Sequence, residues 1–197
     1  MQGRLIAFEG LDQSGKRTQT SLLRHALETA GRRAELLAFP DYTTAIGAEI
    51  AAALADRRQH PPDVLQLLFI ANRHEHRERL IDWLTAGAVV ICDRYIASSV
   101  AYGEAHDLDP DWLETVQCRL PQPDLTLLLD IEPRVGIGRK RSDRDRFERD
   151  LELLRRVRES YRRQAERHHW AVIDGSLPRT AVTDAVQQAV RARLGLP

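Results

Sequence analysis

Short apolar runs alternate along this chain with longer segments whose apolar residues recur at helical spacing. The runs cover residues 5–8, 34–39, 88–92, 125–131 and 170–173. They hold few polar side chains, whereas a strand with one face in water would alternate apolar and polar residues. The pattern therefore predicts an α/β fold with a parallel sheet and helices on both faces, and such a sheet binds its ligands at the carboxyl ends of the strands.

The longer segments predict helices with one apolar face. In the first and the last of them, the expected core residues are Leu22, Leu23, Ala26, Leu27 and Ala30, and Val182, Ala185, Val186, Ala189 and Val190. Residues 61–63, Pro-Pro-Asp, open a further helix that we expect to continue through Trp83 and to end before Gly87. Asp109 followed by Pro110 predicts another helix start, with the aspartate as the N-cap.

Length, charge and cysteine content narrow the class of protein. The 197 residues suit a single domain spanning 1–197. Lys plus Arg and Asp plus Glu total 29 each, so no net charge attracts nucleic acid or an anionic membrane. Cys92 and Cys118 match neither a metal-binding nor a disulfide pattern, and we expect both to be buried thiols. The chain begins with no signal-like segment and has no apolar run near about 20 residues, so we expect a cytoplasmic protein.

A glycine-rich loop, residues 10–18, follows the first apolar run and is named here the phosphate loop. It matches G-x-x-x-x-G-K-[ST] except that Arg17 takes the last place and the first hydroxyl follows at Thr18. Glycines let consecutive backbone N–H groups point at an anion, and Lys16 adds a point charge. The alternative is a glycine turn that only caps a helix. The expected nucleotide-binding residues are Gly10, Leu11, Asp12, Gln13, Ser14, Gly15, Lys16, Arg17 and Thr18.

Asp93 and Arg94 follow the third apolar run and should lie at the same rim of the sheet as the phosphate loop. A carboxylate there can hold Mg²⁺ directly or through water, and a guanidinium can bind a phosphate with two hydrogen bonds. The alternative is an Asp–Arg pair on the surface.

With these motifs together, the chain resembles the thymidylate kinase family over nearly its whole length. The segments that carry the resemblance are 8–12 with the phosphate loop, 39–42, 68–73, 93–95 with Ser98, Ser99 and Tyr102, and an arginine-rich stretch before Phe147 and Glu148. The resemblance implies a P-loop NTP hydrolase-type three-layer sandwich with a five-stranded parallel sheet, as in nucleoside monophosphate kinases. It also implies a homodimer that transfers the γ-phosphate of ATP to dTMP in the presence of Mg²⁺.

The resemblance also implies a set of acceptor-binding residues. They are Asp12, Phe39, Pro40, Tyr42, Phe69, Arg73, Arg94, Ser98, Ser99, Tyr102, Phe147 and Glu148. Phe69 and Arg73 are four residues apart on one helix face, where a ring can stack on thymine and a guanidinium can donate to its O4. For Phe69 the alternative is core packing, and for Arg73 it is a solvated helix face.

Other members of this set resemble residues that recognise the sugar and the base edge. Tyr102 resembles the residue whose ring crowds C2′ of the sugar, and Asp12 resembles the carboxylate that binds the 3′-hydroxyl. Ser98 and Ser99 resemble residues that reach the thymine edge, although serines in these places are also common at helix starts.

The arginine-rich stretch, about 138–147, is named here the lid. Such runs are often solvated loops, but an arginine that reaches the transferred phosphate accelerates phosphoryl transfer by roughly 10³–10⁵. In the family this arginine comes from the phosphate loop or from the lid, and the loop here offers the uncharged residues Gln13 and Ser14. Arg141 and Arg146 are the leading candidates, followed by Arg139 and Arg144. Phe147 and Glu148 resemble residues that close over the acceptor, while Glu148 could also cap the next helix.

Lys16, Asp93, Arg94, Arg141 and Arg146 are therefore the expected catalytic residues. Because a guanidinium at position 17 cannot ligate Mg²⁺, Asp93 and Asp12 are the expected metal ligands, with Glu148 as a helper. His74 and His76 are expected on the surface, since two residues that are two apart on a helix do not share a metal ion easily.

Two other functions are compatible with these motifs. Another nucleoside or nucleotide kinase of the same fold would share the phosphate loop and the Asp-Arg pair. A non-enzymatic ATP-binding regulator is the second alternative, and its main support is Arg17 in place of the usual hydroxyl.

Overall fold

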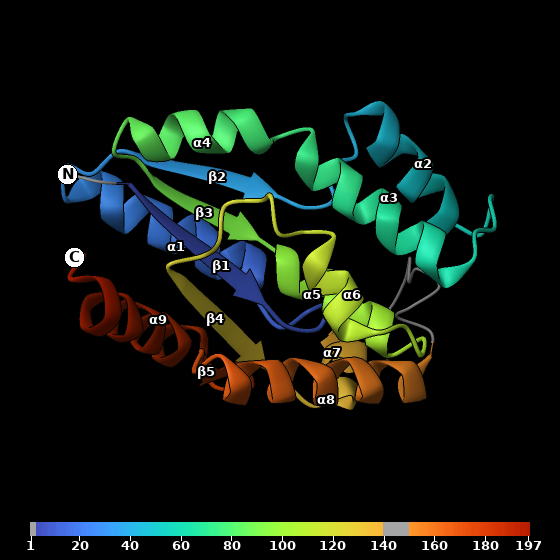
Figure 1. Cartoon of the computed structure of the whole chain (residues 1–197). Coiled ribbons are helices and arrows are strands. Elements are labelled where there is room, and N and C mark those ends of the chain that lie inside the picture. Colours follow the sequence, from blue (N-terminus) through green and yellow to red (C-terminus); the bar gives the residue numbers. More distant parts are fainter. Residues whose placement is uncertain (1–2, 140–149) are drawn as a thin grey trace.

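A computed structural model describes residues 3–139 and 150–197. Its centre is a five-stranded parallel sheet in the order β2-β3-β1-β4-β5 (Figure 1). The strands are β1 (Arg4–Glu9), β2 (Ala34–Ala38), β3 (Val89–Asp93), β4 (Leu125–Asp130) and β5 (Ala171–Asp174). Each lies within one of the apolar runs or within one residue of it, so the predicted fold class is confirmed.

The described helices cover both faces of this sheet. They are α1 (Lys16–Thr29), α2 (Ala45–Leu54), α3 (Pro62–His74), α4 (Arg77–Thr85), α5 (Ile96–Glu104), α6 (Pro110–Thr115), α7 (Pro133–Arg139), α8 (Leu151–Arg167) and α9 (Arg179–Leu194). The helices α1 and α9 pack on one face, while α4, α5 and α8 pack on the other. Among the described residues, no helix is long and apolar enough to span a bilayer.

The central strand β1 shows why its run lacks polar residues. Ile6 and Phe8 pack into the cluster with α1 and α9, whereas Leu5 and Ala7 pack into a cluster on the opposite face. Because consecutive side chains of a strand point to opposite faces, a strand covered on both sides must be apolar throughout. The same requirement applies to β3, whose first four residues are buried.

The predicted helix through Trp83 is instead two helices. The helix α3 ends at His74, Glu75 is its C-cap, and His76 is the N-cap of α4. His76 is buried rather than on the surface, because the break turns its ring against the edge of the Phe39 ring. Both sequence predictions were therefore wrong at this point, and the reason is a contact with a segment more than thirty residues away.

The first helix begins earlier than its apolar pattern suggested, at Lys16. Leu23 and Leu27 are buried as expected, but Leu22 and Ala30 are exposed because they lie away from the sheet. Cys92 is buried and Cys118 is exposed, so the expectation of two buried thiols was half right. Cys118 follows α6 in a turn whose inward position is taken by Gln117.

Candidate active site

The phosphate loop joins β1 to α1 and depends on its glycines. Gly10 and Gly15 have φ angles of 133° and 100°, which side-chain-bearing residues rarely adopt. A Cβ atom on Gly10 would also lie 2.4 Å from the carbonyl oxygen of Leu129 on β4. The glycines are therefore required by the loop conformation and by its close approach to the neighbouring strand.

Lys16 is a buried cation at the base of this loop, with 6% of its surface exposed. Its Nζ donates to the carbonyl oxygens of Gly10 at 3.1 Å and Leu11 at 2.8 Å. Burial and the nearby charge of Arg94 lower the pKa of Lys16 to about 8. A phosphate group would supply the anion that this site favours.

Ser14 adds a second indication that the loop is built for an anion. Its Oγ is buried and makes no hydrogen bond to any residue of 3–139 or 150–197. A buried hydroxyl without a partner costs free energy, and a phosphate oxygen is a suitable acceptor.

Arg94 lies at the same rim of the sheet, because β3 pairs with β1 and places Asp93 opposite Phe8. Its Nη2 donates to Asp12 Oδ1 at 2.7 Å, so the guanidinium pairs with the phosphate loop rather than with its neighbour Asp93. Burial by itself would lower the pKa of Arg94, but Asp12, Tyr102 and the tyrosine of α8 outweigh it and raise that pKa. Arg94 is therefore charged at every physiological pH.

A cavity between α3 and α5 opens beside Arg94 and is named here the α3–α5 cavity. Its lining residues are Asp12, Phe39, Pro40, Tyr42, Leu54, Gln66, Phe69, Arg73, Arg94, Ser98, Ser99 and Tyr102. The structure thus brings together every described residue of the acceptor-binding set. Leu54 and Gln66 line the cavity as well and were not predicted; on the sequence they are ordinary helical residues. Phe147 and Glu148 lie outside the described residues.

Arg73 is the most deeply buried cation of this cavity, with 2% exposure. Its Nη1 donates to Ser99 Oγ at 2.7 Å and to Gln117 Oε1 at 3.2 Å, which are both neutral acceptors. Burial lowers its pKa to about 10, although the negative charge of Glu9 opposes that shift. A buried guanidinium between neutral groups suits a carbonyl oxygen of a ligand as a further acceptor. The burial of Arg73 also excludes the alternative that its side chain lies on a solvated helix face.

The two serines of α5 do not cap their helix. The N-cap is Tyr95, which has no side-chain capping bond. Ser99 accepts from Arg73, and Ser98 donates to Glu9 Oε2 at 2.6 Å. Both hydroxyls are therefore used inside the site rather than at the helix start.

The segment from Phe39 to Thr44 forms another wall of the cavity and is held by the last turn of α3. Asn72 Oδ1 accepts from the backbone N of Asp41 at 2.8 Å, and its Nδ2 donates to the Asp41 carbonyl oxygen at 3.1 Å. His76 Nε2 lies 3.1 Å from Asp41 Oδ2. Burial and the charge of Arg79 lower the pKa of His76, so its imidazole is mainly neutral at pH 7.

The metal donors available in the site are few. Asp93 is partly exposed at the end of β3, and Asp12 is held by Arg94. Across the described ranges, no three His, Cys, Asp or Glu residues are grouped to bind a metal ion. Mg²⁺ takes many ligands from water and phosphates and needs only one or two carboxylates, so these two residues fit a nucleotide-bound Mg²⁺.

Comparison with known proteins agrees with this geometry. The family model for thymidylate kinase matches residues 8–186. The chain belongs to the thymidylate kinase family. It is 39% identical to thymidylate kinase of Schizosaccharomyces pombe over 162 residues, covering 82% of this chain and 77% of that protein. It is 32% identical to the human thymidylate kinase, covering 98% of this chain and 96% of the human protein.

A solved structure shows the same fold. The chain superposes on thymidylate kinase from Candida albicans with a TM-score of 0.83 and 28% sequence identity, covering 97% of this chain and 92% of that one. The five-stranded arrangement expected for a nucleoside monophosphate kinase is therefore confirmed.

Three polar residues of this thymidylate kinase family member were missed by the sequence analysis. Glu9, Gln117 and Tyr161 each contact a predicted site residue, namely Ser98, Arg73 and Arg94 respectively. Glu9 could have been noticed as a charged residue at the end of a buried strand. Gln117 and Tyr161 carry no such mark, because a single polar residue in a helical segment is ordinary.

The lid can be followed only at its start. Arg139 donates from Nη1 to the carbonyl oxygen of Gln13 at 2.9 Å and from Nη2 to that of Gly175 at 3.1 Å. It therefore ties the end of α7 to the phosphate loop. Lys140, Arg141, Arg144 and Arg146 lie outside the described residues.

Proposed function

We propose that this protein transfers the γ-phosphate of ATP to dTMP in the presence of Mg²⁺, giving dTDP and ADP. The observation that carries this proposal is the ion pair between Asp12 and Arg94, which joins the phosphate loop to the wall of the α3–α5 cavity. A donor phosphate in the loop and an acceptor phosphate at Arg94 would then face each other at one rim of the sheet. Their proximity removes most of the entropic cost of bringing two anions together.

On the donor side, the phosphate loop receives the ATP phosphates through its backbone N–H groups. Lys16 bridges the β- and γ-phosphates, because within residues 3–139 and 150–197 its buried ammonium contacts carbonyl oxygens and no carboxylate. Arg17 is exposed and remains free to contact the outer phosphates. Asp93, with Asp12, would hold Mg²⁺, which neutralises charge on the phosphates when bound.

On the acceptor side, Arg94 holds the dTMP phosphate and Arg73 donates to O4 of thymine. Phe69 is half-buried, lines the cavity and stacks on the base. Ser99 orients Arg73, while Asp12 and Tyr102 contact the deoxyribose. Phe39, Pro40, Tyr42 and Ser98 complete the walls around the nucleotide.

Catalysis then depends on position and charge. The acceptor phosphate is already an anion near neutral pH, so no strong general base is required. An arginine of the lid, Arg141 or Arg146, neutralises charge on the transferred phosphate, and Phe147 and Glu148 close over the acceptor. Lid closure also excludes water, which would otherwise compete as the acceptor.

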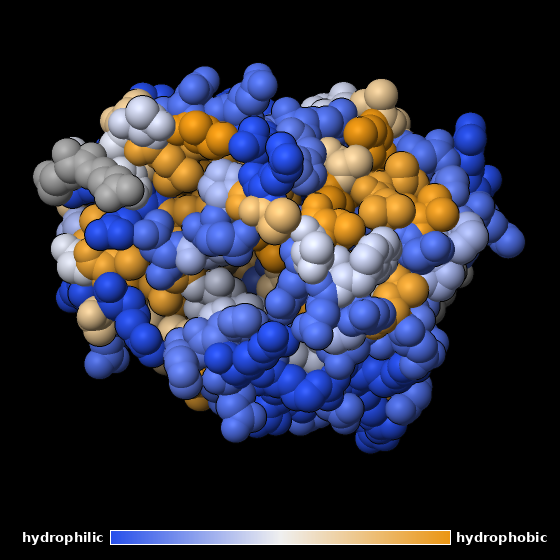
Figure 2. All heavy atoms as spheres, in the orientation of Figure 1, coloured by the Kyte–Doolittle hydropathy of each residue, from blue (hydrophilic) through white to orange (hydrophobic). Residues whose placement is uncertain are grey.

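We also propose that the protein is a cytoplasmic homodimer. Val64 and Leu67 on α3 are 37% and 41% exposed, and Figure 2 shows hydrophobic residues gathered over this part of the surface. Hydrophilic residues instead cover the edge formed by α8. An exposed apolar helix face is typical of a subunit interface, and light scattering should give twice the mass of one chain.

A coupled ADP-release assay tests the proposed activity directly. ATP, Mg²⁺ and one acceptor from dTMP, dUMP, dCMP, dGMP and thymidine are supplied in turn. We expect the highest kcat/KM with dTMP, lower values with dUMP and little turnover with dCMP, because its N4 amino group would meet the donors of Arg73. A preference for another acceptor would indicate a different kinase of this fold, and ATP binding without ADP release would indicate a regulator.

A further inference from the structure

Glu9 is a fully buried carboxylate beneath the candidate active site. It is the last residue of β1 and has 0% of its surface exposed. A carboxylate without solvent is costly unless several donors point at it. The groups that donate to Glu9 therefore show which parts of the site depend on this carboxylate.

Three donors from two distant helices meet the Glu9 carboxylate. Oε1 accepts from the backbone N of Tyr95 at 2.8 Å. Oε2 accepts from Ser98 Oγ at 2.6 Å and from Tyr161 Oη at 3.1 Å. In the described part of the chain, no Lys or Arg forms an ion pair with Glu9, so its charge is balanced through these hydroxyls and by cations farther away.

The backbone around Arg94 depends on this carboxylate. Arg94 has a φ of 63°, a left-handed conformation that is unfavourable for a residue with a side chain. Its own N–H donates to the carbonyl oxygen of Phe8 at 2.9 Å, and the next N–H, that of Tyr95, donates to Glu9. Consecutive residues of β1 thus hold the peptide groups on both sides of the Arg94 Cα.

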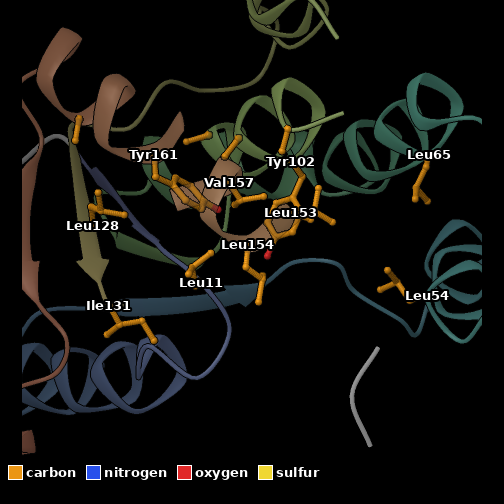
Figure 3. Close-up of a cluster of buried hydrophobic side chains, with 14 of the residues drawn as sticks. Leu11, Leu54, Leu65, Tyr102, Leu128, Ile131, Leu153, Leu154, Val157 and Tyr161 are labelled. Carbon is orange, nitrogen blue, oxygen red and sulfur yellow. The ribbon is translucent and has the colours of Figure 1, made fainter. Parts of the chain in front are cut away.

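The guanidinium of Arg94 depends on the same network. Its Nη1 donates to Tyr161 Oη at 3.1 Å and to Ser98 Oγ at 3.3 Å, the two hydroxyls that donate to Glu9. Tyr161 comes from α8 and lies with Tyr102 of α5 in the buried cluster of Figure 3. Arg94 Nη1, the two hydroxyls and the Glu9 carboxylate therefore form one hydrogen-bonded network, in which Ser98 Oγ and Tyr161 Oη also lie 2.8 Å from each other.

We propose that Glu9 is the positioning residue for Arg94, holding its strained backbone and its guanidinium in the orientation that receives the acceptor phosphate. This inference rests on the proposed dTMP kinase function. Burial lowers the pKa values of Lys16 and Arg73, and the negative charge of Glu9 partly opposes that lowering, which supports a role as a shared counter-charge of the site. Glu9 acts through other residues and touches neither reacting phosphate.

Glu9→Gln is the most direct test, because the amide keeps the volume but loses the charge and turns one acceptor into a donor. We expect KM for dTMP to rise about tenfold, while KM for ATP stays within about twofold of the parent value. Tyr161→Phe removes only the bridging hydroxyl and should raise KM for dTMP about fivefold. The double variant should lose less than the product of the two factors, because both act through Arg94.

Glu104→Gln is the matched control. Glu104 also joins α5 to α8, through Ser160 and Arg163, but at the far end of α5 from Arg94. We expect this variant to keep the parent KM for dTMP within about twofold. A rise equal to that of Glu9→Gln would mean that general loosening of the α5–α8 contact explains the effect, and it would overturn the proposal.

Two further outcomes would also overturn the proposal. One is parent-like KM and kcat in Glu9→Gln despite a lower melting temperature, which is the result of a purely structural role. The other is parent-like KM in Tyr161→Phe, which decides the matter if Glu9→Gln does not fold. The unsubstituted protein is assayed with dTMP at the same time. If it shows no activity, the proposed function is contradicted, whereas an active parent with unaffected variants contradicts only the role of Glu9.

Discussion

At the residue scale, two cations of the site, Lys16 and Arg73, are buried and contact no carboxylate within the described part of the chain, whereas Arg94 pairs with Asp12. Among the described residues, Lys16 donates to two backbone carbonyl oxygens, and Arg73 donates to a hydroxyl and an amide oxygen. Both pKa values are lowered, mainly by burial. Both residues can therefore donate to a ligand that carries a negative charge or a strong hydrogen-bond acceptor.

Lys16 makes ATP affinity depend on pH. Its pKa in the free protein is lowered to about 8, and a bound triphosphate raises it again by stabilising the ammonium. Affinity should therefore be nearly constant below pH 8 and fall by up to about tenfold per pH unit above it, until the pKa of the complex is reached.

Calorimetry with a non-hydrolysable ATP analogue from about pH 7 to about pH 9.5 measures this dependence. In Lys16→Met the curve should be flat over the same range, turnover should be lost, and dTMP binding should remain. If the affinity of Lys16→Met for the ATP analogue falls with pH as it does in the parent, another group is responsible for the titration. If Lys16→Met also loses dTMP binding, Lys16 does not act on the donor nucleotide alone.

Arg73 should contribute to acceptor affinity alone. We expect Arg73→Ala to weaken dTMP binding by about tenfold or more, because a buried hydrogen bond from a charged donor is lost. ATP binding should not change, since Arg73 lies on the wall of the α3–α5 cavity. Calorimetric titration with each nucleotide measures both affinities.

Arg77→Ala is the control for this experiment. Arg77 lies one turn farther along, at the start of α4, and donates to the carbonyl oxygen of Arg119 rather than into the cavity. Its removal should leave dTMP affinity unchanged. Unchanged affinity in Arg73→Ala as well would remove Arg73 from the base site.

At the element scale, the break between α3 and α4 positions one wall of the cavity. The helix end places Asn72, Glu75 and His76 against the segment 39–44. A continuous helix would carry His76 away from Phe39 and Asp41. The break lies within residues 72–79, none of which is apolar, so the apolar pattern could not show whether one helix continued through this stretch or two helices met in it.

Asn72 provides the test of this arrangement. It bonds both backbone groups of Asp41 and also donates to Thr44 Oγ1 and Glu75 Oε2. We expect Asn72→Ala to lower the free energy of unfolding by about 2 kcal/mol, because buried backbone groups lose their partner. It should also raise KM for dTMP, since Phe39 and Pro40 are then less well held.

Denaturant unfolding and steady-state kinetics measure these two effects. Asp82→Ala, at an exposed position of α4, is the control and should change neither quantity much. A destabilised Asn72→Ala with an unchanged KM for dTMP would show that the segment 39–44 does not contribute to acceptor binding.

At the scale of the whole molecule, the two faces of the sheet have different tasks. The cluster with α1 and α9 contains no residue that lines the α3–α5 cavity, whereas the cluster with α5 and α8 contains Leu54 and Tyr102, which do. Leu27 belongs to the first cluster and is fully buried near the end of α1. Leu27→Ala should therefore lower the free energy of unfolding by about 3 kcal/mol and leave both KM values unchanged.

Thermal or denaturant unfolding together with the ADP-release assay checks this prediction. A raised KM for either nucleotide in Leu27→Ala would show that packing near the end of α1 affects the conformation of the phosphate loop at the start of this helix. Leu22→Ala, at an exposed position of the same helix, is the matched control and should cost little stability.

The sequence alone predicted the sheet, the glycine-rich loop after its first strand, and the position of Asp93 and Arg94 at the rim beside that loop. These features follow from local rules: a buried strand is apolar throughout, a tight anion-binding loop needs glycines, and strand ends place Asp93 and Arg94 beside that loop. The resemblance to thymidylate kinases then selected Phe69, Arg73, Ser98, Ser99 and Tyr102 from among residues with ordinary structural alternatives.

Only the tertiary structure decided how those residues are held. Glu9 and Tyr161 are 152 positions apart in sequence, and Asn72 and Asp41 are 31 apart, so no local pattern links them. The break before His76 likewise depends on its contact with Phe39 across the site. Apolar periodicity records which side of an element is buried, but the partner of a buried polar group is set by which elements the fold brings together.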